Sequence, residues 1–157
     1  PTPLSGAPLH GTMFSAPRES GQCMAGEQAY EELLKMSVVA VVGCSVRPER
    51  ASHRVAKYLI ESGFRVIPVN PNYKEVLGET CFPDLKSVPE AIEVVDVFRR
   101  AEEVPKIVDE AIAVGAKGLW LQDGIDAPAA AEKARRAGLK VVVNDCLMRQ
   151  HLSRFGR

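Results

Sequence analysis

The chain has 157 residues, of which 46% are hydrophobic and 25% are charged, and its 20 basic and 20 acidic residues give a net charge of zero. This length predicts one domain with a sizeable core, and the balanced charge argues against a general surface for nucleic acids or membranes. No apolar run approaches the roughly 18 residues of a membrane span. The four cysteines are widely spaced without a Cys-x-x-Cys pair, which disfavours a zinc site and a disulfide framework and indicates a reducing, cytoplasmic compartment.

The first part of the chain, residues 1–25, is rich in Pro, Gly, Ser and Ala and shows no apolar periodicity. Such a composition predicts a disordered N-terminal extension, so the expected folded unit is a single domain at residues 26–157. A short helix is expected at residues 27–36, because Tyr30 and Leu34 share one helical face.

The first strand is predicted at residues 38–42, where five apolar residues run without alternation. Such a run is typical of a strand that is buried on both faces of a parallel sheet. Gly43 follows it, and a short loop with small and basic residues leads to a helix that is predicted to begin near Ala51. Free N–H groups and the positive end of the helix dipole meet at such a helix start, so the loop suits a phosphate group.

Beyond this helix, strands and helices alternate with regular spacing. Helices end at Gly63, Gly115 and Gly138, and each glycine is followed two residues later by a basic residue. Glycine supplies the left-handed conformation that stops a helix, and three such joints predict a parallel sheet with helices on both faces. The further strands are expected at 64–69, 94–98, 118–121 and 139–143. The helices are expected at 51–62, 102–114, 128–137 and 145–152, with Asp126 as the N-cap of the third. A mixed segment at 73–89 is expected to hold a short turn or helix.

This pattern predicts an α/β, Rossmann-like, doubly wound sheet of five parallel strands in the order 3-2-1-4-5. Ligands of such sheets bind at the carboxyl ends of the strands, near the switch point beside the first strand. The segments that follow the five strands are therefore expected along one edge; they are Gly43-Cys44-Ser45, Asn70-Pro71-Asn72, Phe98-Arg99-Arg100, Gln122-Asp123-Gly124 and Asn144-Asp145-Cys146.

The loop after the first strand lacks the Gly-x-Gly-x-x-Gly pattern of dinucleotide-binding proteins, because Ser45 and Pro48 stand at the second and third glycine positions. The second strand ends in Asn70 rather than in an acid that holds a ribose hydroxyl, so an NAD dehydrogenase is disfavoured. The hydroxyl of Ser45 and the guanidinium groups of Arg47 and Arg50 suit phosphate instead, although exposed loop arginines are also common as solvated charges.

For three other residues near this edge, a structural role competes with a functional one. Ser52 is a better helix cap than a ligand contact, and Trp120 is expected in the core. Cys44 stands beside a helix N-terminus, which favours a reactive thiolate, although a small residue in a tight loop is the simpler explanation.

Two adjacent arginines, Arg99 and Arg100, directly follow the predicted third strand. One side chain is expected to point over the sheet edge toward the ligand, and the other to pair with Glu102 or Glu103. This basic strand end adds positive charge to the edge where a ligand is expected.

Several segments in a fixed order also carry a family resemblance: Val41-Val42-Gly43-Cys44-Ser45, Pro48-Glu49-Arg50-Ala51-Ser52, Arg65-Val66-Ile67-Pro68-Val69-Asn70-Pro71, Val95-Asp96-Val97-Phe98-Arg99-Arg100, and Gly115-Ala116-Lys117 with Trp120-Leu121-Gln122. Together they make the chain from about residue 30 to residue 155 resemble the small stand-alone CoA-binding proteins. These proteins are similar to the CoA-binding domain of the succinyl-CoA synthetase α subunit and of ADP-forming acyl-CoA synthetases. The resemblance implies a Rossmann-type fold whose strand ends hold coenzyme A.

The resemblance also implies which strand ends hold which part of the ligand. The loop after the first strand matches the phosphate loop, the third strand end lines the adenosine side, and the fourth lies near the pantetheine. Together with the basic residues of the loop, the expected cofactor-binding residues are Gly43, Cys44, Ser45, Val46, Arg47, Arg50, Ser52, Asn70, Pro71, Asn72, Tyr73, Lys74, Phe98, Arg99, Leu121, Gln122 and Asp123.

Three features depart from the family pattern. Tyr73 occupies a position where the synthetases offer a lysine, and Lys74 stands one residue further on. The chain has Asn144-Asp145-Cys146 after the last strand, where the stand-alone family often has Asp-Arg-Cys. The 157 residues do not include the synthetase domain with the phosphorylated histidine, so the ligase reaction is not implied.

These observations favour a module that binds CoA or acyl-CoA without chemistry of its own, because no Ser/His/Asp or Cys/His arrangement is recognisable. An oxidoreductase is the alternative, dependent either on NAD(P) or on a thiol of Cys44 or Cys146. A regulatory or scaffold subunit is the third hypothesis, with residues 1–25 as a tether. The expected ligand is a small molecule rather than nucleic acid or a membrane, and a homodimer or a protein partner is left open.

Overall fold

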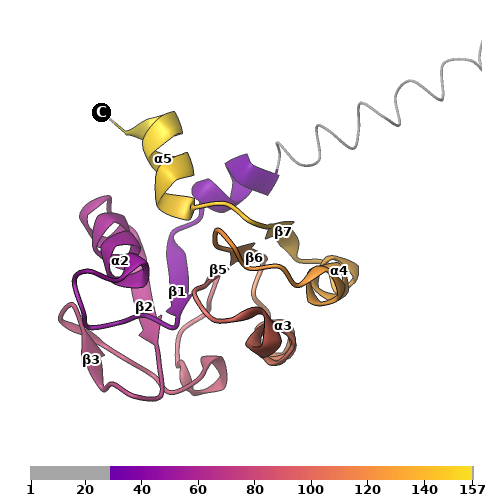
Figure 1. Cartoon of the computed structure of the whole chain (residues 1–157), viewed down its shortest axis with the longest axis horizontal. Helices are drawn as coiled ribbons and strands as arrows, with labels where there is room; N and C mark the ends of the chain where they lie inside the picture. Colours follow the sequence, from indigo (N-terminus) through magenta and orange to yellow (C-terminus); the bar gives the residue numbers. More distant parts are fainter. Residues whose placement is uncertain (1–28, 157) are drawn as a thin grey trace, which may run out of the picture.

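A single parallel sheet forms the centre of the computed structural model, which describes residues 29–156 (Figure 1). Every neighbouring pair of its strands is parallel. The strands lie in the order β2 (Arg65–Val69), β1 (Val38–Val42), β5 (Val94–Val97), β6 (Gly118–Leu121) and β7 (Lys140–Val142).

Helices cover both faces of this sheet, as Figure 1 shows. On one face, α2 (Ala51–Glu61), α5 (Leu147–Phe155) and the helical residues 29–34 pack in one core cluster with every second residue of β1. On the other face, α3 (Val104–Ala113) and α4 (Pro128–Arg136) pack against the alternate residues. Because both faces are covered, the strands consist almost entirely of buried apolar residues, as their sequences indicated.

The α/β fold with a five-stranded parallel sheet and helices on both faces is therefore confirmed. The three glycine joints are confirmed as well, since Gly63, Gly115 and Gly138 all have positive φ and each follows the end of a helix. Trp120 is also in the core as expected, with no exposed surface.

The predicted strand order 3-2-1-4-5 is wrong. The third strand of that prediction is β5, and it pairs with β1 rather than with β2. Pro68 explains part of this, because a proline has no N–H for a second ladder and is confined to edge strands. The outer side of β2 is instead covered by Phe82, whose N–H donates to the Pro68 carbonyl over 3.1 Å and whose carbonyl accepts from Asn70 N.

Irregular structure fills the connection from β2 to β5, which the sequence marked only as a mixed segment. It contains a two-stranded antiparallel hairpin of β3 (Glu75–Val76) and β4 (Glu79–Thr80), followed by the 3-10 helix η2 (Leu85–Ser87). A second 3-10 helix, η3 (Ala101–Glu103), precedes α3. With this topology the switch point of the sheet lies between β1 and β5, where the connections leave in opposite directions.

One predicted cap is also wrong. Ala127, not Asp126, is the N-cap residue of α4, and it makes no side-chain cap. The helix begins at Pro128, as predicted, because the φ of proline is preset for a first helical position, and the N-cap position therefore falls on Ala127.

The predicted disordered extension, residues 1–25, lies outside the described residues. Within residues 29–156, no helix is both long and apolar enough to span a membrane.

Candidate functional site

The carboxyl ends of β1 and β5 meet at Gly43, which has a φ of +87°. A Cβ atom at this position would lie 2.7 Å from the Phe98 carbonyl oxygen and 2.7 Å from Cδ of Arg99. Backbone hydrogen bonds hold the same junction, from Gly43 N to the Val69 carbonyl at 2.8 Å and from Phe98 N to the Val42 carbonyl at 2.9 Å. Only glycine fits where the chain leaves β1 across the end of β5.

The loop after Gly43 is held by side chains of the helix that it precedes. Ser52 Oγ accepts a hydrogen bond from Ser45 N at 3.0 Å, and Ser45 Oγ accepts one from Arg47 N at 3.0 Å. His53 Nδ1 lies 2.9 Å from the Ser45 carbonyl oxygen. The expectation that Ser52 caps α2 is therefore wrong: the N-cap residue is Arg50, and Ser52 is buried in the first turn, where it fixes the loop.

The N-terminus of α2 remains open for an anion. Arg50 places no side chain on the free first-turn N–H groups, and the first turn contains no acidic residue. Arg47 and Arg50 are exposed beside it, and neither has an ion-pair partner among residues 29–156. The helix dipole and two guanidinium groups thus bring positive charge to one place.

The second strand end braces this loop from the side. The buried side chain of Asn70 donates from Nδ2 to the Cys44 carbonyl at 3.1 Å and accepts at Oδ1 from Asn72 N at 2.9 Å. Both the amide nitrogen and the amide oxygen of Asn70 are thus bonded within the protein, so this side chain holds the loop in place. The turn that follows is accessible at Pro71, Asn72 and Lys74, and Tyr73 is half-buried.

A pocket of about 410 Å³ lies between the ends of β1 and β5 on the α3 side, and we call it the β1–β5 pocket. Its walls include Gly43, Pro71 and Arg99. Its rim is acidic, because the lining also contains four carboxylates against the two cations of Arg99 and Lys106; the carboxylates are those of Asp84, Glu102, Glu103 and Glu110. This balance disfavours a phosphate inside the pocket and suits a neutral group with hydrogen-bond donors.

Arg99 is oriented by an acid of this rim. Its Nε donates to Glu103 Oε1 at 3.0 Å, and its Nη2 lies 2.8 Å from the same oxygen. Arg100 also approaches Glu103, with Nε 3.6 Å from Oε2. The expectation that only one of the two arginines pairs is therefore wrong, since both share Glu103, although Arg99 still lines the β1–β5 pocket.

A second pocket of about 450 Å³ lies between α2 and α5, and we call it the α2–α5 pocket. Phe98, Gln122 and Asp123 line it from the strand ends, and Cys146 lines it from the start of α5. Its remaining walls are the apolar side chains of Ala51, Val55, Met148 and Leu152, together with Arg54 and Arg149. An apolar pocket with few polar groups is a common setting for a small-molecule ligand.

Arg149 lines one side of this pocket and forms two ion pairs, with Asp123 and Asp145, that were not predicted from the sequence. Its Nη1 and Nη2 donate to the two carboxylate oxygens of Asp123, each at 3.0 Å, and Nη2 also donates to Asp145 Oδ1 at 2.6 Å. The only sequence signal was the i, i+4 spacing of the opposite charges of Asp145 and Arg149.

Below the α2–α5 pocket lies Asp96, a carboxyl group with no exposed surface. Gln122 donates from Nε2 to Asp96 Oδ1, whereas Oδ2 has no hydrogen-bond partner among the described residues. Burial raises the pKa of Asp96 to about 8. The sequence signal was a single acid inside the otherwise apolar run at residues 94–97.

Cys44 does not fit a nucleophilic role. The side chain has no exposed surface, and burial raises its pKa to about 12, with further contributions from Cys81 and Asp96. The hypothesis of a reactive Cys44 thiolate is therefore contradicted, whereas Cys146 remains partly accessible in the α2–α5 pocket.

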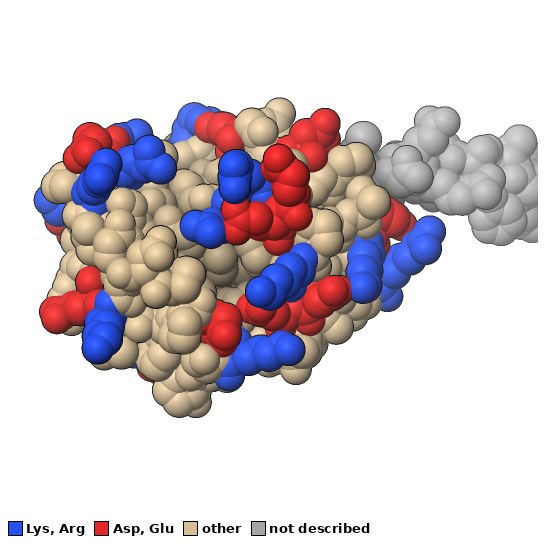
Figure 2. Space-filling model, turned by 60° about the horizontal axis from the view of Figure 1, so that its bottom comes forward, with Lys and Arg blue, Asp and Glu red and all other residues tan. Residues whose placement is uncertain are grey.

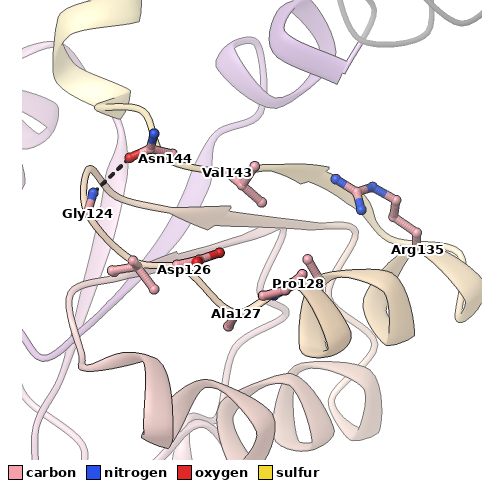
Figure 3. A pocket seen from close by; sticks show the side chains of 9 residues that line it. Gly124, Asp126, Ala127, Pro128, Arg135, Val143 and Asn144 are labelled. Carbon is pink, nitrogen blue, oxygen red and sulfur yellow. Dashed lines mark hydrogen bonds between the residues drawn. The ribbon is translucent and has the colours of Figure 1, made fainter.

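A third pocket of about 490 Å³ lies at the ends of β6 and β7 beside the start of α4, and we call it the β6–β7 pocket (Figure 3). Asn144 stands on its upper wall with a φ of +53°, and its Oδ1 accepts a hydrogen bond from Gly124 N at 2.8 Å. This bond ties the turn after β6 to the end of β7. Gly124 and Asn144 belong to strand-end segments that were expected along the carboxyl edge, but the sequence did not predict a pocket between them.

Most of the predicted residues come together along the carboxyl edge. The exceptions are side chains that face the protein rather than a ligand, because Leu121 and Cys44 have no exposed surface and Asn70 is bonded internally. In Figure 2, where the lower side of Figure 1 is turned forward, Lys and Arg are interspersed with Asp and Glu instead of forming one basic face. On this face positive charge is therefore not gathered into one patch.

Comparisons with known proteins point to one family. Residues 37–151 match a family model described as a CoA binding domain. The uncharacterized protein YneT of Bacillus subtilis is 36% identical over 122 residues, which cover 77% of this chain and 90% of that protein. A solved structure of a hypothetical protein from Pyrococcus horikoshii OT3 is 43% identical, covers 82% of this chain and 90% of that one, and superposes with a TM-score of 0.78.

A longer relative contains a similar segment. An ADP-forming acetate–CoA ligase of Archaeoglobus fulgidus is 31% identical over 127 residues, which cover 74% of this chain but only 18% of the ligase. The similarity to the ligase thus concerns one part of a much longer protein.

Proposed function

The chain belongs to the CoA binding domain family, and from this premise we propose that it binds coenzyme A or an acyl-CoA at the carboxyl edge of its sheet. The observation that carries the proposal is the open N-terminus of α2, with the exposed side chains of Arg47 and Arg50 next to it, which have no ion-pair partner among the described residues. CoA has several phosphate groups, and this is where the described residues concentrate positive charge without neutralising it.

The phosphates are proposed to lie on the loop of residues 43–47 and on the first turn of α2. Backbone N–H groups at a helix start give directed hydrogen bonds to phosphate oxygens, and Arg47 and Arg50 add charge-assisted ones. Ser45 and Ser52 serve this site indirectly, because Ser52 Oγ accepts from Ser45 N and Ser45 Oγ accepts from Arg47 N, and these bonds shape the loop. The roles of Val46 and the backbone of Cys44 follow from their place in the same loop.

The adenosine is proposed to occupy the β1–β5 pocket. Carboxylates on the rim accept hydrogen bonds from a ribose hydroxyl or the adenine amino group, whereas they repel phosphate. Pro71 and the glycine surface at Gly43 offer a flat apolar contact for a ring. Asn72, Tyr73 and Lys74 lie in the turn that follows Pro71, within reach of the same part of the ligand.

The pantetheine arm is proposed to run through the α2–α5 pocket. Phe98 and Met148 provide apolar contact, and Gln122 provides an amide that matches the two amides of pantetheine. Asp123 is held by Arg149 at the rim, so its carboxylate is fixed beside the proposed path.

Isothermal titration of the full chain with CoA tests the proposal, with NAD and ATP as competitors for the same edge. We expect saturable binding of CoA at micromolar affinity or tighter and much weaker binding of NAD. The double variant Arg47→Ala/Arg50→Ala should bind CoA roughly 100-fold more weakly, at about tenfold for each of the two lost charge-assisted contacts. The double variant Lys133→Ala/Arg136→Ala on α4 removes the same charge from another surface and should bind as the unaltered chain does.

Three results would contradict the proposal. They are the absence of CoA binding, binding of NAD in preference to CoA, and equal loss of CoA affinity in the two double variants. The last result would show that general charge, and not the start of α2, attracts the ligand.

A further inference from the structure

The β6–β7 pocket adjoins the proposed path of the pantetheine arm. Gln122 and Asp123 line the α2–α5 pocket, and Gly124, the next residue, lines the β6–β7 pocket. The turn at residues 122–124 is therefore the boundary between the two. An extended group that passes over the end of β6 leaves the first pocket and enters the second.

Five of the nine residues that line this pocket have apolar side chains. They come from both sides, as Figure 3 shows, with Val143 above and Ala127 and Pro128 below, and Ile125 and Ala131 complete the lining. Val143 directly follows β7 yet is 40% exposed, so its side chain is incompletely packed by the described residues. A ligand that covers this valine removes apolar surface from water, which favours binding.

The charges at the pocket have opposite sign. Asp126 and Arg135 both line it, and Figure 3 shows their charged groups at separate points of the wall. Arg135 already lies 3.7 Å from Glu132 on its own helix. One carboxylate and one guanidinium give no net attraction for an anion, so the pocket suits an uncharged group better than a carboxylate.

One hydrogen bond connects the two sides of the pocket. The hydrogen bond from Gly124 N to Asn144 Oδ1 joins the lip on β6 to the lip on β7. The volume of the β6–β7 pocket, about 490 Å³, lies within the range of small-molecule sites.

We propose that the β6–β7 pocket holds the acyl group of a CoA thioester, and that this group is short, aliphatic and uncharged. The inference rests on the proposed CoA site, because the pocket lies at the far end of the pantetheine path. It goes further in naming an acyl-CoA rather than free CoA as the preferred ligand.

Titration of the full chain with CoA, acetyl-CoA, butyryl-CoA and succinyl-CoA tests the inference. Each added methylene that becomes buried should tighten binding about fourfold, so butyryl-CoA should bind more tightly than acetyl-CoA by more than tenfold. Succinyl-CoA has a similar length but ends in a carboxylate, so it should gain little over acetyl-CoA.

Variants at Val143 separate the pocket from the CoA site. Val143→Asp should abolish the advantage of butyryl-CoA and leave the affinity for free CoA unchanged, and Val143→Ser provides a milder second change with the same expectation. Phe155→Asp places the same charge at an exposed apolar residue that does not line this pocket, and it should keep the advantage. Thermal unfolding of each variant verifies that it is folded.

The outcomes distinguish the inference from its premise. Equal affinity for CoA and all three thioesters overturns the acyl pocket and leaves the CoA proposal standing. A folded Val143→Asp chain that retains the preference for butyryl-CoA also overturns the acyl pocket. Failure to bind CoA or any thioester overturns both.

Discussion

Gln122 at the end of β6 donates a hydrogen bond from Nε2 to Oδ1 of Asp96 on β5, over 2.5 Å and beneath the α2–α5 pocket. The bond links a residue that lines the pocket to a carboxyl group in the core. It fixes the amide of Gln122, and it leaves the second oxygen of Asp96 without a partner among the described residues.

The stability of the fold should therefore depend on pH through Asp96. Its pKa is raised from 3.8 to about 8 by burial, so between these values the folded protein keeps a proton that the unfolded chain has released. Folding then binds a proton, and the contribution of Asp96 to stability is largest at acidic pH and is lost progressively as the pH rises toward 8.

Asp96→Asn isolates this contribution, because asparagine keeps an acceptor for Gln122 and does not titrate. The melting temperature of the unaltered chain minus that of Asp96→Asn should fall steadily between pH 5 and pH 8 and level off above pH 8. A difference that stays constant over this interval would show that Asp96 is ionised in the folded protein.

Replacement of Gly43 by alanine should destabilise the protein by about 2–4 kcal/mol, because a Cβ atom there meets the Phe98 carbonyl and the Arg99 side chain and the backbone has a positive φ. Gly63→Ala is the matched control: its φ is +97°, but nothing lies within 4 Å of the new Cβ. It should cost only about 1–2 kcal/mol. Urea denaturation of both variants measures the comparison, and equal losses would exclude the steric contact as a cause.

The strand order illustrates what the sequence could and could not predict. Alternating strands, helices and glycine joints identified the sheet, because burial on both faces and helix termination leave local patterns in the chain. The order of the strands depends on which strand edges pair. That pairing depends on contacts between segments, such as the hydrogen bond of Phe82 with Pro68, and the periodicity of single helices and strands does not reveal such contacts. Pro68 was the one local signal that β2 is an edge strand.

The candidate site shows the same division. Gly43 and the basic loop were predictable, because the residue types themselves indicate a tight turn and phosphate chemistry. The contacts of Arg149 with Asp123 and of Asn144 with Gly124 were not predictable, since each joins residues at least 20 positions apart in the chain.

Ser52→Ala should weaken both the fold and the binding of CoA. The change leaves the buried N–H of Ser45 without its acceptor, at a cost of about 1–3 kcal/mol, and frees the loop that shapes the proposed phosphate site. Ser62→Ala, at the exposed C-cap of the same helix, should have almost no effect. Urea denaturation and CoA titration are compared for the two variants; a change in stability without any change in CoA affinity would separate this loop from the ligand.

Alkylation should distinguish the cysteines of the described region. Cys44 and Cys81 are buried and burial raises the pKa of both thiols, so they should resist iodoacetamide in the folded protein at pH 7.5 and react only after unfolding. Cys146 is partly accessible in the α2–α5 pocket and should react in the folded state. Saturating CoA should slow the reaction of Cys146 at least tenfold if the pantetheine arm lies in that pocket, whereas adenosine 3′,5′-bisphosphate, which lacks the arm, should protect it much less. Mass spectrometry of the modified peptides measures each rate, and equal protection by the two ligands would place the pantetheine elsewhere on the strand edge.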